Sequence, residues 1–353
     1  MIAKYSTGLV VGKFCPLHLG HEMLIQRAID TCRRVVVISY TKPEFPGSEQ
    51  AQRETWLQAR FPTVRTLVID DSRLQALCHR VGCETKAIPH NEASDTEQRA
   101  FVSWLCTSVL KEHIDAVFTS ENYGDGFAHA LSLAQRAAGA PGSNVTHECV
   151  DRARTLVPIS GSQIRRDPFR YRGFMSPSVY RSLIKRGCFL GGESSGKTTI
   201  ASLLAQTFNT NWVPEYGREL WISKDGRLQM EDMLAIAVTQ VQREEQLSET
   251  ANRWLFCDTS PLTTLFYSLE MFGRAEDKLY ELAKRSYAQI FLCAPDFLFV
   301  QDGTRRDSVF QKRQHEWYKT TLDASGIAYS ELTGTVADRN AKAREALGKV
   351  DRC

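Results

Sequence analysis

The sequence has no apolar run long enough to cross a membrane. A spanning helix needs about 18 or more consecutive apolar residues, and none of the 353 residues belongs to such a run. The first predicted strand, at residues 7–11, follows Met1 after only a few residues, so we expect no signal peptide and a cytoplasmic protein. Lysine and arginine form no basic block and the net charge is only +3, which argues against a nucleic-acid partner.

Cys-x-x-Cys pairs are also absent, although the chain contains 10 cysteines. The scattered spacing argues against a zinc site and against the disulfide framework of a small secreted protein. Several of the cysteines lie inside apolar runs, where a thiol behaves as a small buried hydrophobe. We therefore expect reduced thiols.

What the sequence does contain is a repeated alternation of strand and helix patterns. In the first half, strands are predicted at 7–11, 35–39, 65–69, 116–119 and 145–150, with helical patterns around 21–33, 50–61, 97–112 and 127–138. In the second half, they are predicted at 188–191, 212–214, 254–257, 289–293, 298–300 and near 327–330, with one long helix at 230–250. Such alternation predicts parallel sheets covered by helices, here in two domains at 1–170 and 171–353.

The segment GKFCPLHLGH, Gly12 to His21, lies between the first strand and the first helix. The free N–H groups and the dipole of a helix start favour anions there. His18 and His21, three residues apart, share one face of the first turn and could hold a triphosphate. The alternative is a polar turn with two surface histidines. The segment resembles the G-x-F-x-P-x-H-x-G-H motif of the nucleotidyltransferase superfamily.

A second segment supports that resemblance. ISGSQIR, Ile159 to Arg165, is similar to the superfamily's I-S-x-T-x-x-R element, with Ser162 in place of threonine. The hydroxyls of Ser160 and Ser162 can donate to phosphate oxygens, and the planar guanidinium of Arg165 suits them. By itself the segment would equally fit a serine-capped helix start.

A separate phosphate site is predicted at CFLGGESSGKTT. Gly191, Gly196, Lys197 and Thr198 have the spacing of a Walker A loop, between an apolar strand and a helix. In such a loop the backbone N–H groups cradle phosphates, the lysine reaches the β- and γ-phosphates, and the hydroxyl binds magnesium.

Both motif sets in this order resemble the NadR-type bifunctional enzymes, which pair nicotinamide-nucleotide adenylyltransferase with ribosylnicotinamide kinase. Besides the three motifs, the resemblance rests on FTSENYGDG, on DPFRYR after ISGSQIR, on PEYGRE, on CDTSPLTT and on DGTRRD. It implies a Rossmann-like nucleotidyltransferase domain followed by a P-loop kinase domain, both α/β with parallel sheets. Some members carry an N-terminal helix-turn-helix repressor module. Only about six residues precede the first strand here, so we expect no such module.

For the first domain, the resemblance implies transfer of the adenylyl group of ATP to nicotinamide mononucleotide, giving NAD and pyrophosphate. His18 and His21 are the expected catalytic residues, and the expected ATP-binding residues are Gly12, Lys13, Phe14, His18, His21, Ser160, Ser162 and Arg165. Phe14 and Trp104 are candidates for stacking on nicotinamide, although Trp104 fits a core position equally well. The turn at 119–121 is expected to face the adenosine.

For the second domain, the resemblance implies phosphorylation of ribosylnicotinamide by ATP with Mg²⁺. The expected ATP-binding residues are Gly191, Glu193, Ser194, Ser195, Gly196, Lys197, Thr198, Thr199, Arg305 and Arg313. Lys197, Glu215, Asp258 and Arg305 are expected to be catalytic, Thr198 and Asp258 to bind the metal, and Glu215, Tyr216 and Arg218 to bind the nicotinamide substrate. Arg305 and Arg313 fit a mobile lid or, alternatively, a solvated surface pair.

Two other functions stay open from the sequence. One is a coenzyme A-forming fusion of pantetheine-phosphate adenylyltransferase with dephospho-coenzyme A kinase, which shares both motif sets. The other is a sensor that binds nucleotides without turnover, which the intact His18, His21, Lys197 and Thr198 disfavour. The expected partners are small molecules only (ATP, ribosylnicotinamide, nicotinamide mononucleotide and NAD), and a homo-oligomer is left open.

Overall fold

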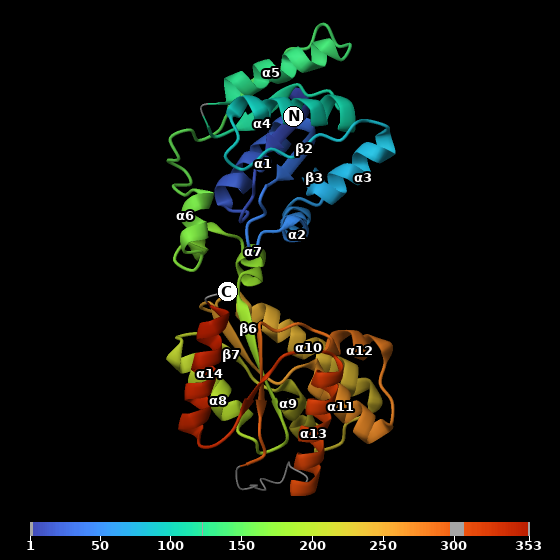
Figure 1. Ribbon diagram of the computed structural model, residues 1–353, viewed down its shortest axis with the longest axis vertical. Coiled ribbons are helices and arrows are strands. Elements are labelled where there is room, and N and C mark those ends of the chain that lie inside the picture. The colour runs from blue at the N-terminus through green and yellow to red at the C-terminus, as the bar shows by residue number, and fades with distance from the viewer. Residues whose placement is uncertain (1–2, 122, 297–306, 352–353) are drawn as a thin grey trace. The chain divides into compact units, whose positions relative to one another are not determined.

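The chain folds into two compact units, one ending at Tyr180 and the other starting at Arg181 (Figure 1). The structure, a computed structural model, describes residues 3–121, 123–296 and 307–351. The boundary expected from the sequence, between residues 170 and 171, lies earlier in the chain. Val179 and Tyr180 are buried, and the ring of Tyr180 packs against Phe169. This contact keeps the segment after residue 170 with the first unit.

The first unit is built on a parallel sheet of five strands in the order β3-β2-β1-β4-β5. The strands are β1 (Tyr5–Val11), β2 (Cys32–Tyr40), β3 (Arg65–Ile69), β4 (Ala116–Thr119) and β5 (Thr146–Cys149). All five strands expected from the sequence are present. Strand β1 lies in the middle of the sheet, and the strand order proceeds from it to β3 on one side and to β5 on the other. The carboxyl end of β1 is therefore the topological switch point, where ligands bind in such sheets.

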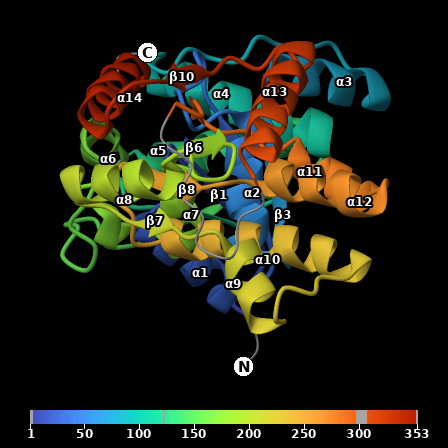
Figure 2. The same cartoon turned by 90° about the horizontal axis from the view of Figure 1, so that it is seen from below.

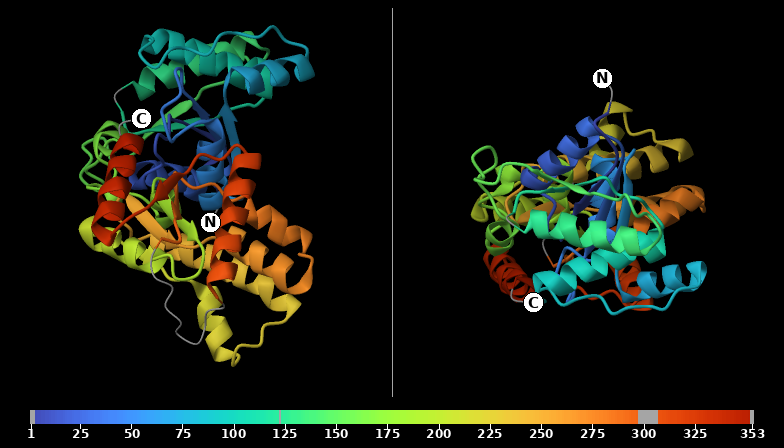
Figure 3. Two further views of the ribbon diagram at one scale, coloured as in Figure 1. Left: turned by 60° about the horizontal axis from the view of Figure 1, so that its bottom comes forward. Right: turned by 90° about the horizontal axis from the view of Figure 1, so that it is seen from above.

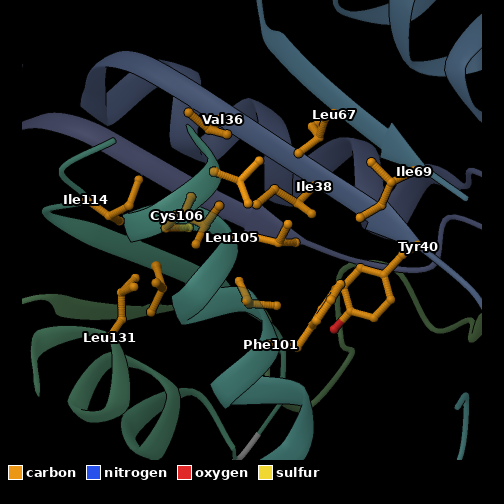
Figure 4. Packing of buried hydrophobic residues seen from close by; sticks show 14 of the residues in the cluster. Val36, Ile38, Tyr40, Leu67, Ile69, Phe101, Leu105, Cys106, Ile114 and Leu131 are labelled. Atoms are coloured by element: carbon orange, nitrogen blue, oxygen red, sulfur yellow. The ribbon is translucent and has the colours of Figure 1, made fainter. Parts of the chain in front are cut away.

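Helices cover both faces of this sheet. The helices between residues 19 and 182 are α1 (Leu19–Thr31), α2 (Gln50–Arg60), α3 (Asp71–Val81), α4 (Asp95–Trp104), α5 (Gly124–Ala137), α6 (Gly161–Arg166) and α7 (Pro177–Ser182), with a π-helical turn at Leu105–Leu110 and a 3₁₀ turn at Arg172–Phe174. The last two helices, α6 and α7, follow the sheet's final strand. Helices α4 and α5 lie side by side over one face (Figures 1 and 3). Beneath them, Ile38 and Leu67 of the sheet pack against Phe101 and Leu105 (Figure 4).

The second unit repeats the plan with five parallel strands in the order β10-β9-β6-β8-β7. They are β6 (Lys185–Gly191), β7 (Trp212–Val213), β8 (Trp254–Asp258), β9 (Gln289–Cys293) and β10 (Ser330–Leu332). The strand expected near 327–330 starts only at Ser330, and the one expected at 298–300 lies outside the described residues. The α/β class and the two parallel sheets are as predicted.

Alternate side chains of the central strands bury against different helices. Phe189 and Phe291 pack toward α8 (Lys197–Thr207) and α14 (Val336–Val350), which lie together on one face (Figure 2). Leu190 and Leu292 pack toward the other set of helices. That set comprises α10 (Met230–Ser248), α11 (Pro261–Phe272), α12 (Asp277–Ala283) and α13 (Ser308–Ala324), and the short α9 (Tyr216–Ser223) follows β7.

Candidate active sites

In the first unit, the chain passes from the end of β1 through a tight turn into α1. His18 is the N-cap residue of α1, and its Nδ1 accepts a hydrogen bond from the Gly20 N–H at 3.2 Å. A backbone N–H can only donate, so Nδ1 carries no proton. The neutral ring therefore carries its proton on Nε2, which is free to donate to a phosphate oxygen.

The two histidines of the motif form one packed unit. The rings of His18 and His21 stack with 3.7 Å between centroids, and Phe14 meets His21 edge-on at 4.9 Å. Burial lowers the pKa of His18 to about 4, with smaller contributions from Arg154 and Arg165. Burial also lowers the pKa of His21 well below its ordinary value. Both rings are thus neutral hydrogen-bond donors near pH 7, not cations.

Positive charge around these histidines comes from three other side chains. Lys13 donates to the Asn91 carbonyl at 2.9 Å, and Arg165 donates to the Cys15 carbonyl at 2.7 Å. Arg154 forms an ion pair with Glu121 at 2.7 Å. All three cations line the same cavity or its rim. They can neutralise the charge of a bound triphosphate, which the buried rings cannot do.

The serines of ISGSQIR have different surroundings. The Ser160 hydroxyl caps α6, accepting from the Gln163 N–H and donating to the Gln163 side chain at 2.9 Å. This is the helix-capping alternative noted from the sequence, although Ser160 also lines the cavity. Ser162 accepts from Arg165 at 3.2 Å and lines the cavity as well.

These residues surround a cavity of about 400 Å³ at the carboxyl end of the sheet. It brings together the sequence-predicted residues of both motifs and the turn at 119–121. Its lining includes Gly12, Lys13, Phe14, His18, His21, Ser160, Ser162 and Arg165. An adjoining cavity of about 300 Å³ shares Gly12, Lys13 and Tyr123 with it and extends to Tyr40.

The two aromatic candidates for nicotinamide stacking are placed differently. Phe14 lines the larger cavity but is fully buried, and its ring is packed against His21. Trp104 packs against the core cluster, with Phe101 at 5.6 Å and the Lys86 ammonium over its ring. It lines neither cavity, so the structure agrees with the alternative reading of Trp104 as a core residue.

In the second unit, β6 ends at Gly191 and the loop to α8 has the conformation its glycines allow. Gly191 and Gly196 have φ of 142° and 80°, which favour glycine. A Cβ on Gly191 would lie 2.5 Å from the Cys293 carbonyl oxygen, so close approach also demands glycine there. Lys197 folds over the loop and donates to the Gly191 and Gly192 carbonyls at 3.1 and 3.0 Å.

Two buried carboxylates face this loop. Asp258 ends β8 and accepts from the Thr198 hydroxyl at 2.5 Å, while Glu215 precedes α9 and lies 3.5 Å from Arg218. Burial raises the pKa of both carboxyls, and the nearby Lys197 ammonium opposes that shift in both. The two acids thus lie near one ammonium, that of Lys197, beside the loop.

A cavity of about 380 Å³ opens beside Glu215. One part is lined by polar residues including Lys197, Glu215 and Arg218, and another by Trp221 and Met233. Tyr216 does not line it, because its ring lies against the Arg243 guanidinium at 4.5 Å. The sequence reasoning missed Trp221. The available signal was a large aromatic side chain shortly after PEYGRE on the same helix.

The other expected kinase residues have different surroundings. Ser195 is fully buried in the loop, and Glu193 accepts from the Tyr267 hydroxyl at 2.9 Å. Ser194 has φ of 59°, and Thr199 is exposed on α8. Arg313 is exposed and paired with Glu270. Arg305 lies outside the described residues.

Oxygen ligands suited to a divalent cation are present beside the loop. Thr198 and Asp258 meet there, and the buried Asp258 Oδ1 has no hydrogen-bond partner among the described residues. Hydroxyl and carboxylate oxygens are the ligands that Mg²⁺ prefers. In the described part of the chain, this site included, no group of three or more His, Cys, Asp or Glu side chains is arranged to hold a metal ion. None of the described helices combines the length and the apolar character that crossing a membrane requires.

Comparison with known proteins identifies the family. The trifunctional NAD biosynthesis/regulator protein NadR of Salmonella typhimurium (strain LT2) is 30% identical over 319 residues, covering 85% of this chain and 72% of that protein. The NadR protein of Escherichia coli (strain K12) is 29% identical over 344 residues, covering 92% and 78%. The chain belongs to the NadR family.

Solved NadR structures share the whole fold. A NadR protein in complex with NAD and AMP-PNP matches with a TM-score of 0.64 at 18% identity, covering 99% of this chain and 98% of that one. A NadR complex with NR matches with a TM-score of 0.62 at 17% identity, covering 99% and 96%. An AAA domain family model matches residues 186–339, which include the P-loop. The NadR fold therefore extends over both units.

Proposed function

We propose that this chain is a bifunctional NAD salvage enzyme. Its P-loop unit phosphorylates ribosylnicotinamide, and its first unit transfers the adenylyl group of ATP to the resulting mononucleotide. The observation that carries the proposal is that one chain of the NadR family holds two separate phosphate sites, each with an adjoining cavity for a second substrate.

In the kinase step, the 5′-hydroxyl of ribosylnicotinamide attacks the γ-phosphorus of ATP. The new O–P bond forms as the bond to ADP breaks, and the hydroxyl proton passes to Glu215. A carboxylate with a raised pKa is a better proton acceptor than an ordinary one. Lys197 leaves the loop carbonyls to bind the β- and γ-phosphates.

Mg²⁺ fits the oxygen ligands of this site. We assign it to Thr198 and Asp258, and when bound it would neutralise charge on the β- and γ-phosphates. Asp258 already accepts from the Thr198 hydroxyl, so the two ligands are preorganised side by side. Arg218, paired with Glu215, is placed to orient that carboxylate toward the acceptor.

In the adenylyl transfer step, a phosphate oxygen of the mononucleotide attacks the α-phosphorus of ATP and pyrophosphate leaves. No protein nucleophile is required, because the attacking phosphate is already anionic. His18 and His21 donate hydrogen bonds from neutral rings, while Lys13, Arg154 and Arg165 neutralise the developing charge. The adjoining cavity that reaches Tyr40 and Tyr123 is large enough for the nicotinamide half.

A direct assay distinguishes the proposed function from its alternative, the coenzyme A-forming fusion. Purified protein is incubated with ATP, magnesium and either ribosylnicotinamide or pantetheine phosphate, and nucleotide products are resolved by chromatography. We expect mononucleotide and then NAD from ribosylnicotinamide. Turnover of pantetheine phosphate alone would overturn the proposal, and binding of ATP without any product would favour the sensor.

A further inference from the structure

Two buried glutamines line the acceptor cavity of the P-loop unit without a role in phosphate binding. Gln240 lies on α10 and Gln314 on α13, and each is only 1% exposed. Both border the cavity that also contains Glu215 and Trp221. A buried amide normally has all of its hydrogen-bonding atoms satisfied, so any unpaired atom here requires an explanation.

The surroundings of Gln240 fix which way its amide faces. Its oxygen accepts from the Tyr216 backbone N–H at 2.9 Å. Because a backbone N–H can only donate, the oxygen must occupy that position. The Nε2 amino group is then the unsatisfied end, and it has no partner among the described residues. Gln240 thus presents a free donor.

Gln314 has the opposite end of its amide unpaired. The Tyr318 hydroxyl donates to Thr263 Oγ1 at 2.7 Å, so its oxygen is left to accept from Gln314 Nε2, at 3.5 Å. Burial raises the pKa of Tyr318, which keeps that hydroxyl protonated. Gln314 Oε1 is consequently the unsatisfied atom, with no partner in the described part of the chain. Gln314 presents a free acceptor.

Gln240 and Gln314 border one cavity, one with a buried unpartnered donor and the other with a buried unpartnered acceptor, and the pair matches a neutral group that accepts at one atom and donates at another. We propose that Gln240 and Gln314 recognise the carboxamide of ribosylnicotinamide, Gln240 donating to its oxygen and Gln314 accepting from its amino group. This inference rests on the proposed kinase function and names the part of the substrate that the two glutamines bind. It makes the kinase selective for the amide over the corresponding carboxylic acid.

The acid would be disfavoured by one lost contact. A carboxylate has no hydrogen to donate to Gln314, so one buried acceptor stays unpaired. The ribose hydroxyls are the other groups that both donate and accept, but each can rotate to serve either role. Only the carboxamide requires one fixed donor and one fixed acceptor, which is what the unpaired ends of the two glutamines offer.

The test compares kcat/KM for ribosylnicotinamide and for its nicotinic acid analogue. Gln240→Met and Gln314→Met remove the polar atoms at similar volume, and Gln242→Met, at an exposed position of α10, is the matched control. We expect Gln314→Met to lose about 10- to 100-fold on the amide, the usual range for an unpaired buried group, and much less on the acid. Gln240→Met should lose on both substrates, because a carboxylate oxygen accepts from Gln240 as an amide oxygen does. The control should behave as wild type.

Binding of an ATP analogue at the P-loop shows that each variant is folded. Equal losses on amide and acid in Gln314→Met, or in either variant a loss that tracks instead with 2′- or 3′-deoxyribose analogues, would overturn the carboxamide assignment. A wild-type protein without activity on ribosylnicotinamide would instead defeat the proposed function. The two failures are therefore distinguishable.

Discussion

At the residue scale, Glu215 and Asp258 share the Lys197 ammonium but differ in their hydrogen bonds. Asp258 is bonded to the Thr198 hydroxyl, whereas Glu215 borders the acceptor cavity. Position along the strands was enough to predict both carboxylates from the sequence. It could not predict Trp221, Gln240 or Gln314, because which helix faces line a cavity depends on tertiary packing.

The different partners predict different effects of neutralising each acid. Asp258→Asn should raise the magnesium concentration needed for half-maximal kinase rate, because a metal ligand loses its charge. Glu215→Gln should lower kcat by roughly 100-fold or more, the usual size of a general-base contribution, with little change in magnesium dependence. Magnesium titrations of both variants test this. If magnesium sensitivity follows Glu215, the two roles must be exchanged.

The buried His18 predicts a pH dependence of stability in the first unit. Its folded pKa of about 4 lies below the ordinary 6.5, so the unfolded chain takes up the proton first as the pH falls. Stability is fully present above pH 6.5 and is lost between 6.5 and 4, by on the order of 3 kcal/mol from His18 alone. His21 acts in the same direction.

The matched variant is His18→Asn, which retains a good helix N-cap but cannot titrate. Urea unfolding of the first unit, followed at several pH values, should show a shallower fall in the free energy of unfolding for this variant than for the wild type. Parallel curves would mean that His18 is not held neutral by burial.

At the scale of elements, the period of apolar residues predicted the strands well. The helix α3 (Asp71–Val81) was not predicted from the sequence, although it has a side-chain cap at Asp70 and a left-handed glycine at Gly82. Both signals can be read from the sequence, so this helix could have been predicted. The domain boundary was placed early because the polar, proline-containing segment after residue 166 resembles a linker, while its packing onto the first unit is a tertiary contact.

Strand β1 depends on a close approach that only glycine permits. A Cβ on Gly8 would lie 2.6 Å from Cys32 Sγ and 2.9 Å from the Phe118 ring, and both neighbours are buried. Gly8→Ala should therefore destabilise the first unit by about 1–3 kcal/mol, the usual cost of overpacking. Gly142→Ala, where nothing lies within 4 Å, is the control and should be near neutral. Thermal unfolding of both variants compares the costs, and equal midpoints would contradict the packing argument.

At the scale of the whole molecule, the residues proposed to bind phosphate in the two steps lie on two separate sheets. Each of the two groups borders its own cavity among the described residues. The two chemical steps should consequently be separable by single substitutions, which is the central claim of the account.

The most direct test follows NAD production by Lys197→Ala and His18→Ala. Lys197→Ala should make no mononucleotide from ribosylnicotinamide yet still form NAD from supplied mononucleotide. His18→Ala should accumulate mononucleotide and form little NAD, and mixing the two variants should restore the full sequence from ribosylnicotinamide. Loss of both activities in either folded variant, or failure of the mixture to make NAD, would contradict two independent sites.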